Sequence, residues 1–408
     1  MAAQDTVWTP GRLLERLERA EPLFVFDVRN RDEAERFRLE GRTALPGVNL
    51  PYFEMLELGG RDDMVDSVVA CVERELEAEL PRDLPVLAVC AKGETSEFVA
   101  EGLRRLGYES ASLAGGMRAW GTHYVTRPVV DEPALAIHQV MRIARGCLSY
   151  VVSSGREALV IDPLRHLEPY LELARARGVR IAGVIDTHAH ADHISGGPAL
   201  AARTGAPYYL HPYDGIHPVD MVPPRIPYEP LREGQVLRAG KVELAVLHVP
   251  GHTLGLVALR LDDRFLLTGD SIFIRSIARP DLGGKADVWA PLHTRSLRRL
   301  AALPEKIVVL PGHFSSLAEA NERGLFAAPL GQLARRNDGL AALRREDDAG
   351  FVRYLLASLP APVAEYMDIK RVNAGLLSPD EDDAFALELG KNVCALSQAY
   401  ATTAGEAS

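Results

Sequence analysis

The chain has 408 residues, of which 47% are hydrophobic and 25% are charged, and its formal net charge is −10. This length exceeds the ~100–150 residues of a common domain, so we expect at least two domains with separate cores. The negative charge argues against nucleic acid or an anionic membrane as a partner, because either would need a basic surface.

The apolar runs are far shorter than the ~20 residues of a membrane span, and the N-terminus lacks the apolar stretch of a signal peptide. The cysteines form no CxxC pairs, and we expect a cytoplasmic protein with reduced thiols.

The first part of the chain alternates between short apolar runs and charged stretches of helical character. The apolar runs cover 23–29 and 85–90, and the helical patterns cover 31–41 and 95–107. Strand and helix in turn predict a parallel sheet covered by helices, which is an α/β fold. We expect this domain to span 1–126. A linker is expected at 127–134, where Pro128 and Pro133 interrupt any helical periodicity.

The second part of the chain is predicted to form a domain over 135–372, followed by an appendage over 373–408. Its elements are expected as a hairpin at 148–163, a helix at 167–178 and strand-forming stretches at 180–190, 241–253 and 256–271. The last residues, 400–408, have the composition of a frayed tail.

The stretch IDTHAHADHISGG, residues 185–197, follows a predicted strand and is dense in possible metal ligands. In an extended segment His188 and His190 point to the same side, while Asp192 and His193 fall where the chain turns. Three further candidates each follow an apolar run beside a glycine, namely His252, Asp270 and His313. Imidazole and carboxylate together favour zinc or iron over magnesium or calcium, which prefer oxygen ligands.

The HxHxDH pattern and the three later positions resemble the metallo-β-lactamase superfamily over residues 138–320. The resemblance implies an αββα sandwich with the metal site at one edge of its two sheets. The superfamily includes hydrolases with two metal ions and oxygenases with one, so the reaction stays open at this point.

Within the superfamily, the segment GDSIFIRSIARPDLGG, residues 269–284, is most similar to the persulfide dioxygenases. That resemblance implies one Fe(II) per chain on His188, His252 and Asp270, a two-histidine, one-carboxylate set. It leaves His190, Asp192, His193 and His313 as further ligands or as hydrogen-bond partners of the ligands. Arg279 is a candidate anchor for a substrate carboxylate, with a surface ion pair as the alternative. The sequence after His313 lacks the acidic pattern of glutathione-dependent members, which leaves the thiol carrier open.

Cys90 ends an apolar strand and is followed by a short loop with Gly93 and then by a helical pattern. Loop amides and a helix N-terminus create a positive potential that would stabilise a thiolate or a bound persulfide. We therefore expect Cys90 to be a nucleophile, and the other cysteines, Cys71, Cys147 and Cys394, to be structural. A phosphatase loop of the C-x5-R type is disfavoured, because Ser96 occupies the position of its arginine.

The N-terminal part resembles the rhodaneses over residues 8–121, through the Asp27-x-Arg29 strand and the closing stretch LAGGMRAW. The resemblance implies transfer of sulfane sulfur through a persulfide on Cys90. Thr95 stands where many active members have arginine, which leaves Lys92 as the cation that would attract thiosulfate. Arg29 is expected to form a structural ion pair.

The function predicted from these patterns is the oxidation of a low-molecular-weight persulfide, such as glutathione persulfide, by dioxygen to sulfite and thiol, coupled to rhodanese-type transfer of sulfane sulfur to or from Cys90. The sulfur donor and the direction of this transfer stay open. Two alternatives remain. One is a thioester hydrolase of the glyoxalase II type with two zinc ions on all seven candidate ligands. The other is a sulfur carrier or sensor with little turnover. The predicted partners are small molecules, with a homodimer as one option for the assembly.

Overall fold

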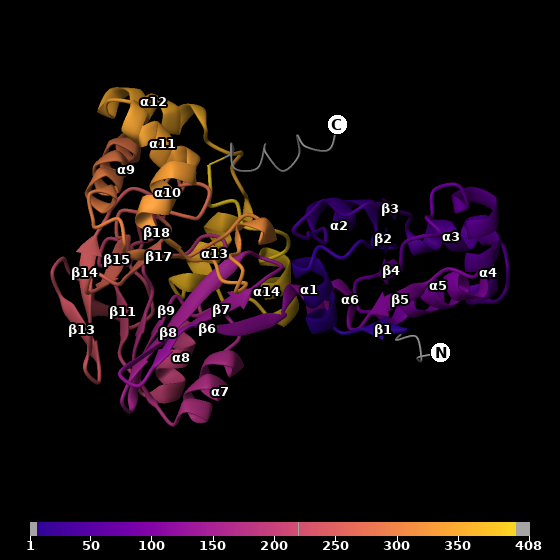
Figure 1. The fold of residues 1–408 in the computed structure, drawn as a ribbon, viewed down its shortest axis with the longest axis horizontal. Helices are drawn as coiled ribbons and strands as arrows, with labels where there is room; N and C mark the ends of the chain where they lie inside the picture. Colours follow the sequence, from indigo (N-terminus) through magenta and orange to yellow (C-terminus); the bar gives the residue numbers. More distant parts are fainter. Residues whose placement is uncertain (1–5, 219, 397–408) are drawn as a thin grey trace.

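The computed structural model describes residues 6–218 and 220–396. Figure 1 shows two bodies side by side, with the N-terminal third of the chain in one and two larger sheets in the other. The predicted α/β class and the two-domain organisation are confirmed. The tail predicted at 400–408 lies outside the described residues. In the part of the chain that the structure describes, no helix is both long and apolar enough to cross a membrane.

The N-terminal domain has a five-stranded parallel sheet in the order β1-β5-β4-β2-β3. Its central strand β4 is buried at every position, which is why its sequence is a continuous apolar run. The strands are β1 Val7–Trp8, β2 Phe24–Asp27, β3 Gly47–Asn49, β4 Val86–Val89 and β5 Ser110–Leu113. The helices are α1 Pro10–Glu18, α2 Arg31–Arg36, α3 Tyr52–Gly59, α4 Met64–Cys71, η1 Val72–Leu76, α5 Glu94–Arg105 and α6 Gly116–Gly121.

The second domain stacks a seven-stranded sheet, β12-β11-β10-β9-β8-β7-β6, on a six-stranded sheet, β13-β14-β15-β16-β17-β18. The first sheet comprises β6 Tyr124–Glu132, β7 Leu135–Arg142, β8 Cys147–Ser154, β9 Glu157–Ile161, β10 Arg180–Ile185, β11 Tyr208–Leu210 and β12 Glu229–Pro230. The second comprises β13 Val236–Ala239, β14 Val242–His248, β15 Val257–Leu261, β16 Phe265–Gly269, β17 Val308–Pro311 and β18 Ala328–Pro329. Strands β7 and β8 are buried throughout, because they lie inside the sandwich.

Helices cover the outer faces of the two sheets (Figure 1). Those along the seven-stranded sheet are α7 Glu168–Arg177 and α8 Gly197–Thr204. The next helices in the chain are α9 Ala286–Ala301, η2 Leu317–Glu319, α10 Leu330–Arg336, α11 Asp338–Arg345 and α12 Asp348–Ala357. Helix α10 contacts β18 of the six-stranded sheet, while α11 and α12 pack against α9. The chain then returns through α13 Glu365–Asn373 and α14 Glu381–Leu387, which lie where the two bodies meet.

Two predicted elements differ from the structure. The segment 127–134, expected as an irregular linker, is mostly strand β6, which pairs antiparallel with β7. Pro128 is accommodated beside an irregularity in register between Pro128 and Val130, at the edge of the sheet, where a missing N–H is tolerated. We infer that the second domain begins with β6. The helix expected at 31–41 ends at Arg36, because Phe37 is already extended.

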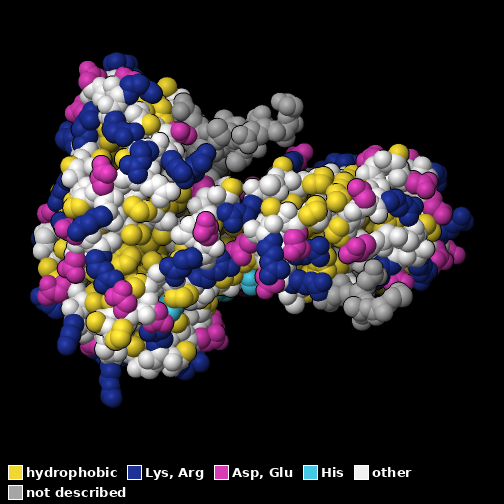
Figure 2. All heavy atoms as spheres, in the orientation of Figure 1, with side chains coloured by type: hydrophobic (Ala, Val, Ile, Leu, Met, Phe, Trp, Pro, Cys, Tyr) yellow, Lys and Arg dark blue, Asp and Glu magenta, His cyan; other side chains and the backbone are white. Residues whose placement is uncertain are grey.

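The two domains are joined by a buried core and by ion pairs. One hydrophobic cluster contains Leu13 and Leu17 of α1 together with Leu135 of β7. Arg118 of α6 pairs with Asp382 of α14 at 2.6 Å. Figure 2 shows basic and acidic side chains interspersed over the visible face of both bodies.

Candidate metal centre and thiol site

The seven predicted ligands come together at one end of the two sheets. The loop after β10 carries four of them, and the others follow β14, β16 and β17. Each is at most 1% exposed: His188, His190, Asp192, His193, His252, Asp270 and His313. These side chains follow the ends of strands, so the packed sheet fixes the backbone that precedes each of them.

Three of these residues form a compact group of their own. One potential ligand atom from each of His188, His252 and Asp270 lies within 4.8 Å of the other two. Asp270 Oδ2 is 3.4 Å from His252 Nε2 and 3.8 Å from His188 Nε2. None of these three atoms has a hydrogen-bond partner among the described residues. Buried polar atoms without a partner are costly, so this set fits a bound metal ion.

The second ring nitrogen of each histidine in this group is held by the protein. His188 Nδ1 lies 3.0 Å from Thr187 Oγ1, which in turn donates to Asp162 Oδ2. His252 Nδ1 lies 2.7 Å from the backbone oxygen of Arg279 and can donate to it. Such partners fix the tautomer and the ring orientation, so that Nε2 is presented as the ligand atom.

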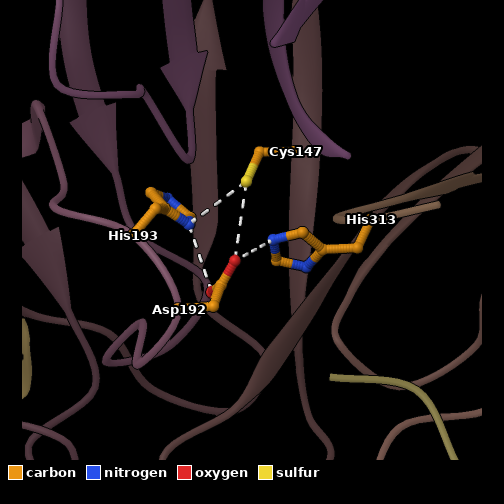
Figure 3. A group of neighbouring side chains, drawn as sticks. All are labelled: Cys147, Asp192, His193 and His313. Atoms are coloured by element: carbon orange, nitrogen blue, oxygen red, sulfur yellow. Dashed lines mark hydrogen bonds and ion pairs between the residues drawn. The ribbon is translucent and has the colours of Figure 1, made fainter. Parts of the chain in front are cut away.

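A second group lies beside the first and includes a thiol that was expected to be structural. Figure 3 shows the Asp192 carboxylate between His313 and His193, with Cys147 above it. Asp192 Oδ2 is 2.8 Å from His313 Nε2, and Asp192 Oδ1 is 3.2 Å from His193 Nδ1. Cys147 Sγ is 3.5 Å from Asp192 Oδ2. His313 Nδ1 also contacts Asp270 Oδ1 at 2.7 Å, so His313 connects the two groups.

His190 belongs to a third group, together with Asp162 and Asp186, which the sequence patterns do not identify as site residues. Its Nε2 lies 3.2 Å from Asp162 Oδ1, while its Nδ1 has no hydrogen-bond partner in the described chain. Asp186 accepts hydrogen bonds from Ser195 and Tyr208. Both aspartates follow adjacent parallel strands, β9 and β10. The signal that pointed to Asp270, a polar residue after an apolar run, was also present at Asp162.

Burial and the neighbouring carboxylates together set the charge state of the histidines. Burial, followed by the neighbouring His190 and His252 rings, holds the pKa of His188 well below its usual value. Burial also lowers the pKa of His252. Both rings are therefore neutral at neutral pH, which is the form that binds a metal. Burial alone would lower the pKa of His313, but the carboxylates of Asp192 and Asp270 raise it well above its usual value.

Arg279 does not serve as an exposed anchor for a substrate in this structure. It is 2% exposed, and Asp281 accepts from its Nε and Nη2 at 2.6 and 2.7 Å. Its other guanidinium hydrogens point to backbone oxygens, those of Pro360, Ala361 and Val393. All five donors of the guanidinium are thus engaged. The ion-pair alternative describes this residue, although the pair is buried.

Cys90 directly follows β4 and lies in a loop built by close backbone packing. The amide of Gly93 donates to Cys90 Sγ at 3.0 Å. The amides of Met117 and Arg118, at the start of α6, donate to the backbone oxygens of Cys90 and Ala91. A backbone amide that donates to the sulfur suits a thiolate or a persulfide, and the two other hydrogen bonds fix the backbone of the loop.

Two other residues of this domain were singled out from the sequence. Lys92 is exposed beside the Cys90 loop. Arg29 forms the expected structural ion pair: it is 5% exposed and donates to Asp27 Oδ2 at 2.6 Å and to the backbone oxygen of Phe37.

Comparisons with known proteins agree with this architecture. Residues 142–313 match the metallo-β-lactamase superfamily, and residues 9–123 match the rhodanese-like domain. An uncharacterized protein of Aquifex aeolicus is 33% identical over 193 residues, which are 44% of this chain and 90% of that protein. The hydroxyacylglutathione hydrolase of Methylococcus capsulatus is 34% identical over 226 residues, 53% of this chain and 82% of the relative. A crystal structure of a metallo-β-lactamase from Staphylococcus aureus is 27% identical, with a TM-score of 0.53 over 60% of this chain and 74% of that one.

The sandwich, its buried histidine and aspartate groups and these similarities define a metal-binding enzyme fold. The chain belongs to the metallo-β-lactamase superfamily and carries a rhodanese-like domain at its N-terminal end.

Proposed function

We propose that this protein oxidises a low-molecular-weight persulfide with dioxygen at a centre holding one Fe(II), and transfers sulfane sulfur at Cys90. The observation that carries the proposal is the group of His188, His252 and Asp270, whose three ligand atoms face one another without another partner in the described chain. A two-histidine, one-carboxylate set is the ligand type of non-haem Fe(II) oxygenases. Fe(II) bound there would supply the redox chemistry that activates dioxygen.

The overall reaction balances without a further reductant. One persulfide, one dioxygen and one water give one thiol, one sulfite and two protons. The S–S bond breaks, the terminal sulfur loses four electrons, and dioxygen accepts them. The protein holds the ligand rings through Thr187 and the backbone of Arg279, so their orientation is set before substrate binds.

The N-terminal domain would supply persulfide for this reaction. The Cys90 thiolate attacks the outer sulfur of thiosulfate, the S–S bond of thiosulfate breaks, and sulfite leaves. A small thiolate then attacks the outer sulfur of the Cys90 persulfide, which releases the small persulfide and restores the thiolate. The Gly93 amide, 3.0 Å from Cys90 Sγ, would stabilise the anionic sulfur in both steps, and exposed Lys92 would attract the thiosulfate anion.

A thioester hydrolase with two zinc ions is the second candidate. His190 Nδ1 and His193 Nε2 also lack hydrogen-bond partners among the residues described, and Asp192 lies close to His313. These atoms could ligate a second ion beside the first. Several relatives at 32–39% identity carry the name hydroxyacylglutathione hydrolase, which favours this reaction over sulfur carriage alone.

Oxygen uptake with synthetic glutathione persulfide tests the proposal. We expect the wild type to consume dioxygen and to form sulfite in about equal amounts. Cys90→Ser should keep this activity and lose sulfur transfer from thiosulfate, because the thiol and the metal group lie on different domains. Hydrolysis of a hydroxyacylglutathione thioester without any persulfide-dependent oxygen uptake would instead identify the hydrolase.

A further inference from the structure

The loop that carries the HxHxDH motif has little regular secondary structure of its own, and its backbone is held by side chains. Residues 186–193 form bends and irregular structure between β10 and α8. Carbonyl and amide groups in such a buried loop need partners. Three side chains provide them for residues 190–195, namely Arg145, Asn373 and Glu388.

Asn373, the last residue of α13, bonds to the loop at three points. Its Nδ2 donates to the backbone oxygens of His190 and His193, both at 2.9 Å. Its Oδ1 accepts from the amide of Ser195 at 2.8 Å. One half-buried amide side chain therefore spans the segment that carries His190, Asp192 and His193.

Glu388, just after α14, holds the same loop at Ile194, which lies between His193 and Ser195. It is 3% exposed, and its Oε1 accepts from the amide of Ile194 at 2.8 Å. Its Oε2 accepts from Arg142 and Arg165 at 2.8 and 3.0 Å. Arg145 completes the set, since its guanidinium donates to the backbone oxygen of Asp192 and, at 2.9 and 2.8 Å, to those of Leu389 and Gly390.

We propose that Asn373 and Glu388 are positioning residues for the metal centre, so that the C-terminal segment is a structural part of that centre. Both residues lie beyond the part of the chain that matches the superfamily, 142–313. They act on the loop backbone and hence on where His190, Asp192 and His193 point. With one ion, His190 reaches the ligand His188 through Asp162 and Thr187, and Asp192 reaches the ligand Asp270 through His313. With two ions, His190, Asp192 and His193 would be ligands themselves, so the inference applies to both arrangements.

The test measures binding of Co²⁺ to metal-stripped protein, with the visible absorption of the bound ion as the readout of ligand geometry. Asn373→Ala removes all three contacts without leaving a charge, so the variant should fold. Replacing a residue that orients a metal ligand typically lowers the metal affinity roughly 10- to 100-fold. We expect a loss of that size together with a changed absorption spectrum.

Two further variants sharpen the result. Asn373→Asp keeps an acceptor for the Ser195 amide, but it replaces the amide donor by a carboxylate oxygen, which repels the backbone oxygens of His190 and His193. It should therefore bind Co²⁺ no better than Asn373→Ala. Arg371→Gln is the matched control: it lies on the same helix and removes exposed ion pairs to Asp220 and Asp368. It should bind Co²⁺ like the wild type.

Glu388→Gln gives an independent measurement on the second residue, provided that circular dichroism shows a folded protein. It should weaken Co²⁺ binding in the same direction as Asn373→Ala. The proposal is wrong if Asn373→Ala, folded and with lowered thermal stability, binds Co²⁺ with wild-type affinity and spectrum. Such a result would show that Asn373 only stabilises the fold.

Discussion

Each candidate ligand of the compact group has one polar atom held by the protein and one facing the other two residues. His252 donates to the backbone of Arg279, His188 contacts Thr187, and Asp270 Oδ1 is 2.7 Å from His313. The side chains are buried in these orientations, so little rearrangement would accompany metal binding. Preorganised ligands of this kind lower the free-energy cost of assembling the site.

Two aspartate substitutions separate the one-metal and two-metal interpretations. Asp270→Asn should lose the bound metal, because a neutral amide oxygen replaces the only anionic ligand of the compact group. In the one-metal interpretation Asp192→Asn should retain the metal, because Asp192 accepts a hydrogen bond from His193 and pairs with His313 without binding the ion itself. Metal content of the two purified variants, both checked for folding, provides the measurement. Loss of one ion of two in Asp192→Asn would support the two-zinc hydrolase.

At the scale of elements, the Cys90 loop depends on close approach between two glycine-containing turns. Gly116 begins α6 with φ of +58°, and a Cβ built on it would lie 2.4 Å from the backbone oxygen of Cys90. Gly93 has φ of +99°, and its Cβ would lie 2.7 Å from the amide nitrogen of Gly115. The position of the thiol is therefore fixed by backbone packing between the β4–α5 and β5–α6 turns.

Gly116→Ala should impair sulfur transfer at Cys90. The added methyl group collides with backbone, which cannot rotate away as a side chain could, so the loop must shift. We expect at least a tenfold drop in the rate of sulfur transfer from thiosulfate, with unchanged metal content. The control is Gly155→Ala, at the β8–β9 turn, which has a similar φ of +60° but no atom within 4 Å of its Cβ. Equal rates in the two variants would contradict the packing argument.

The sequence predicted elements better than it predicted contacts. Strands β4, β10 and β16 were expected because a continuous apolar run ends at a polar residue, and this pattern is local. The sequence of 127–134 does not predict a strand, because its apolar residues show no clear alternation and β6 is stabilised by its pairing with β7. The HxHxDH motif was visible for the same local reason. The contacts of Asn373 and Glu388 with the metal loop cannot be predicted from the sequence, since their partners lie more than 170 residues away.

At the scale of the whole molecule, the buried side chain of Arg142 connects the N-terminal domain to the metal loop. Arg142 donates from Nε to the backbone oxygen of Gly121, at the end of α6, and from Nη1 to Glu388. Glu388 in turn accepts from Ile194 in the metal loop. Helix α6 begins against the Cys90 loop. The two candidate sites are thus linked through one chain of buried hydrogen bonds.

Arg142→Met should destabilise the protein strongly. Without Arg142, buried Glu388 keeps Arg165 as its ionic partner, and breaking a buried pair typically costs about 3–5 kcal/mol. Arg118→Gln removes the exposed pair with Asp382 at the same domain boundary, where the cost should stay below about 1 kcal/mol. Urea unfolding of both variants at neutral pH gives the comparison. Similar free energies of unfolding in the two variants would show that the buried Arg142–Glu388 pair stabilises the protein no more than the exposed pair does.

The central claim is that the buried group of His188, His252 and Asp270 holds one iron for oxidation of a persulfide. Metal content of protein purified without oxygen tests this claim most directly. Iron and zinc are measured per chain by mass spectrometry after removal of loosely bound ions. We predict about one iron and little zinc per chain. Close to two zinc ions per chain, with little iron, would contradict the claim and identify the centre as that of a hydrolase.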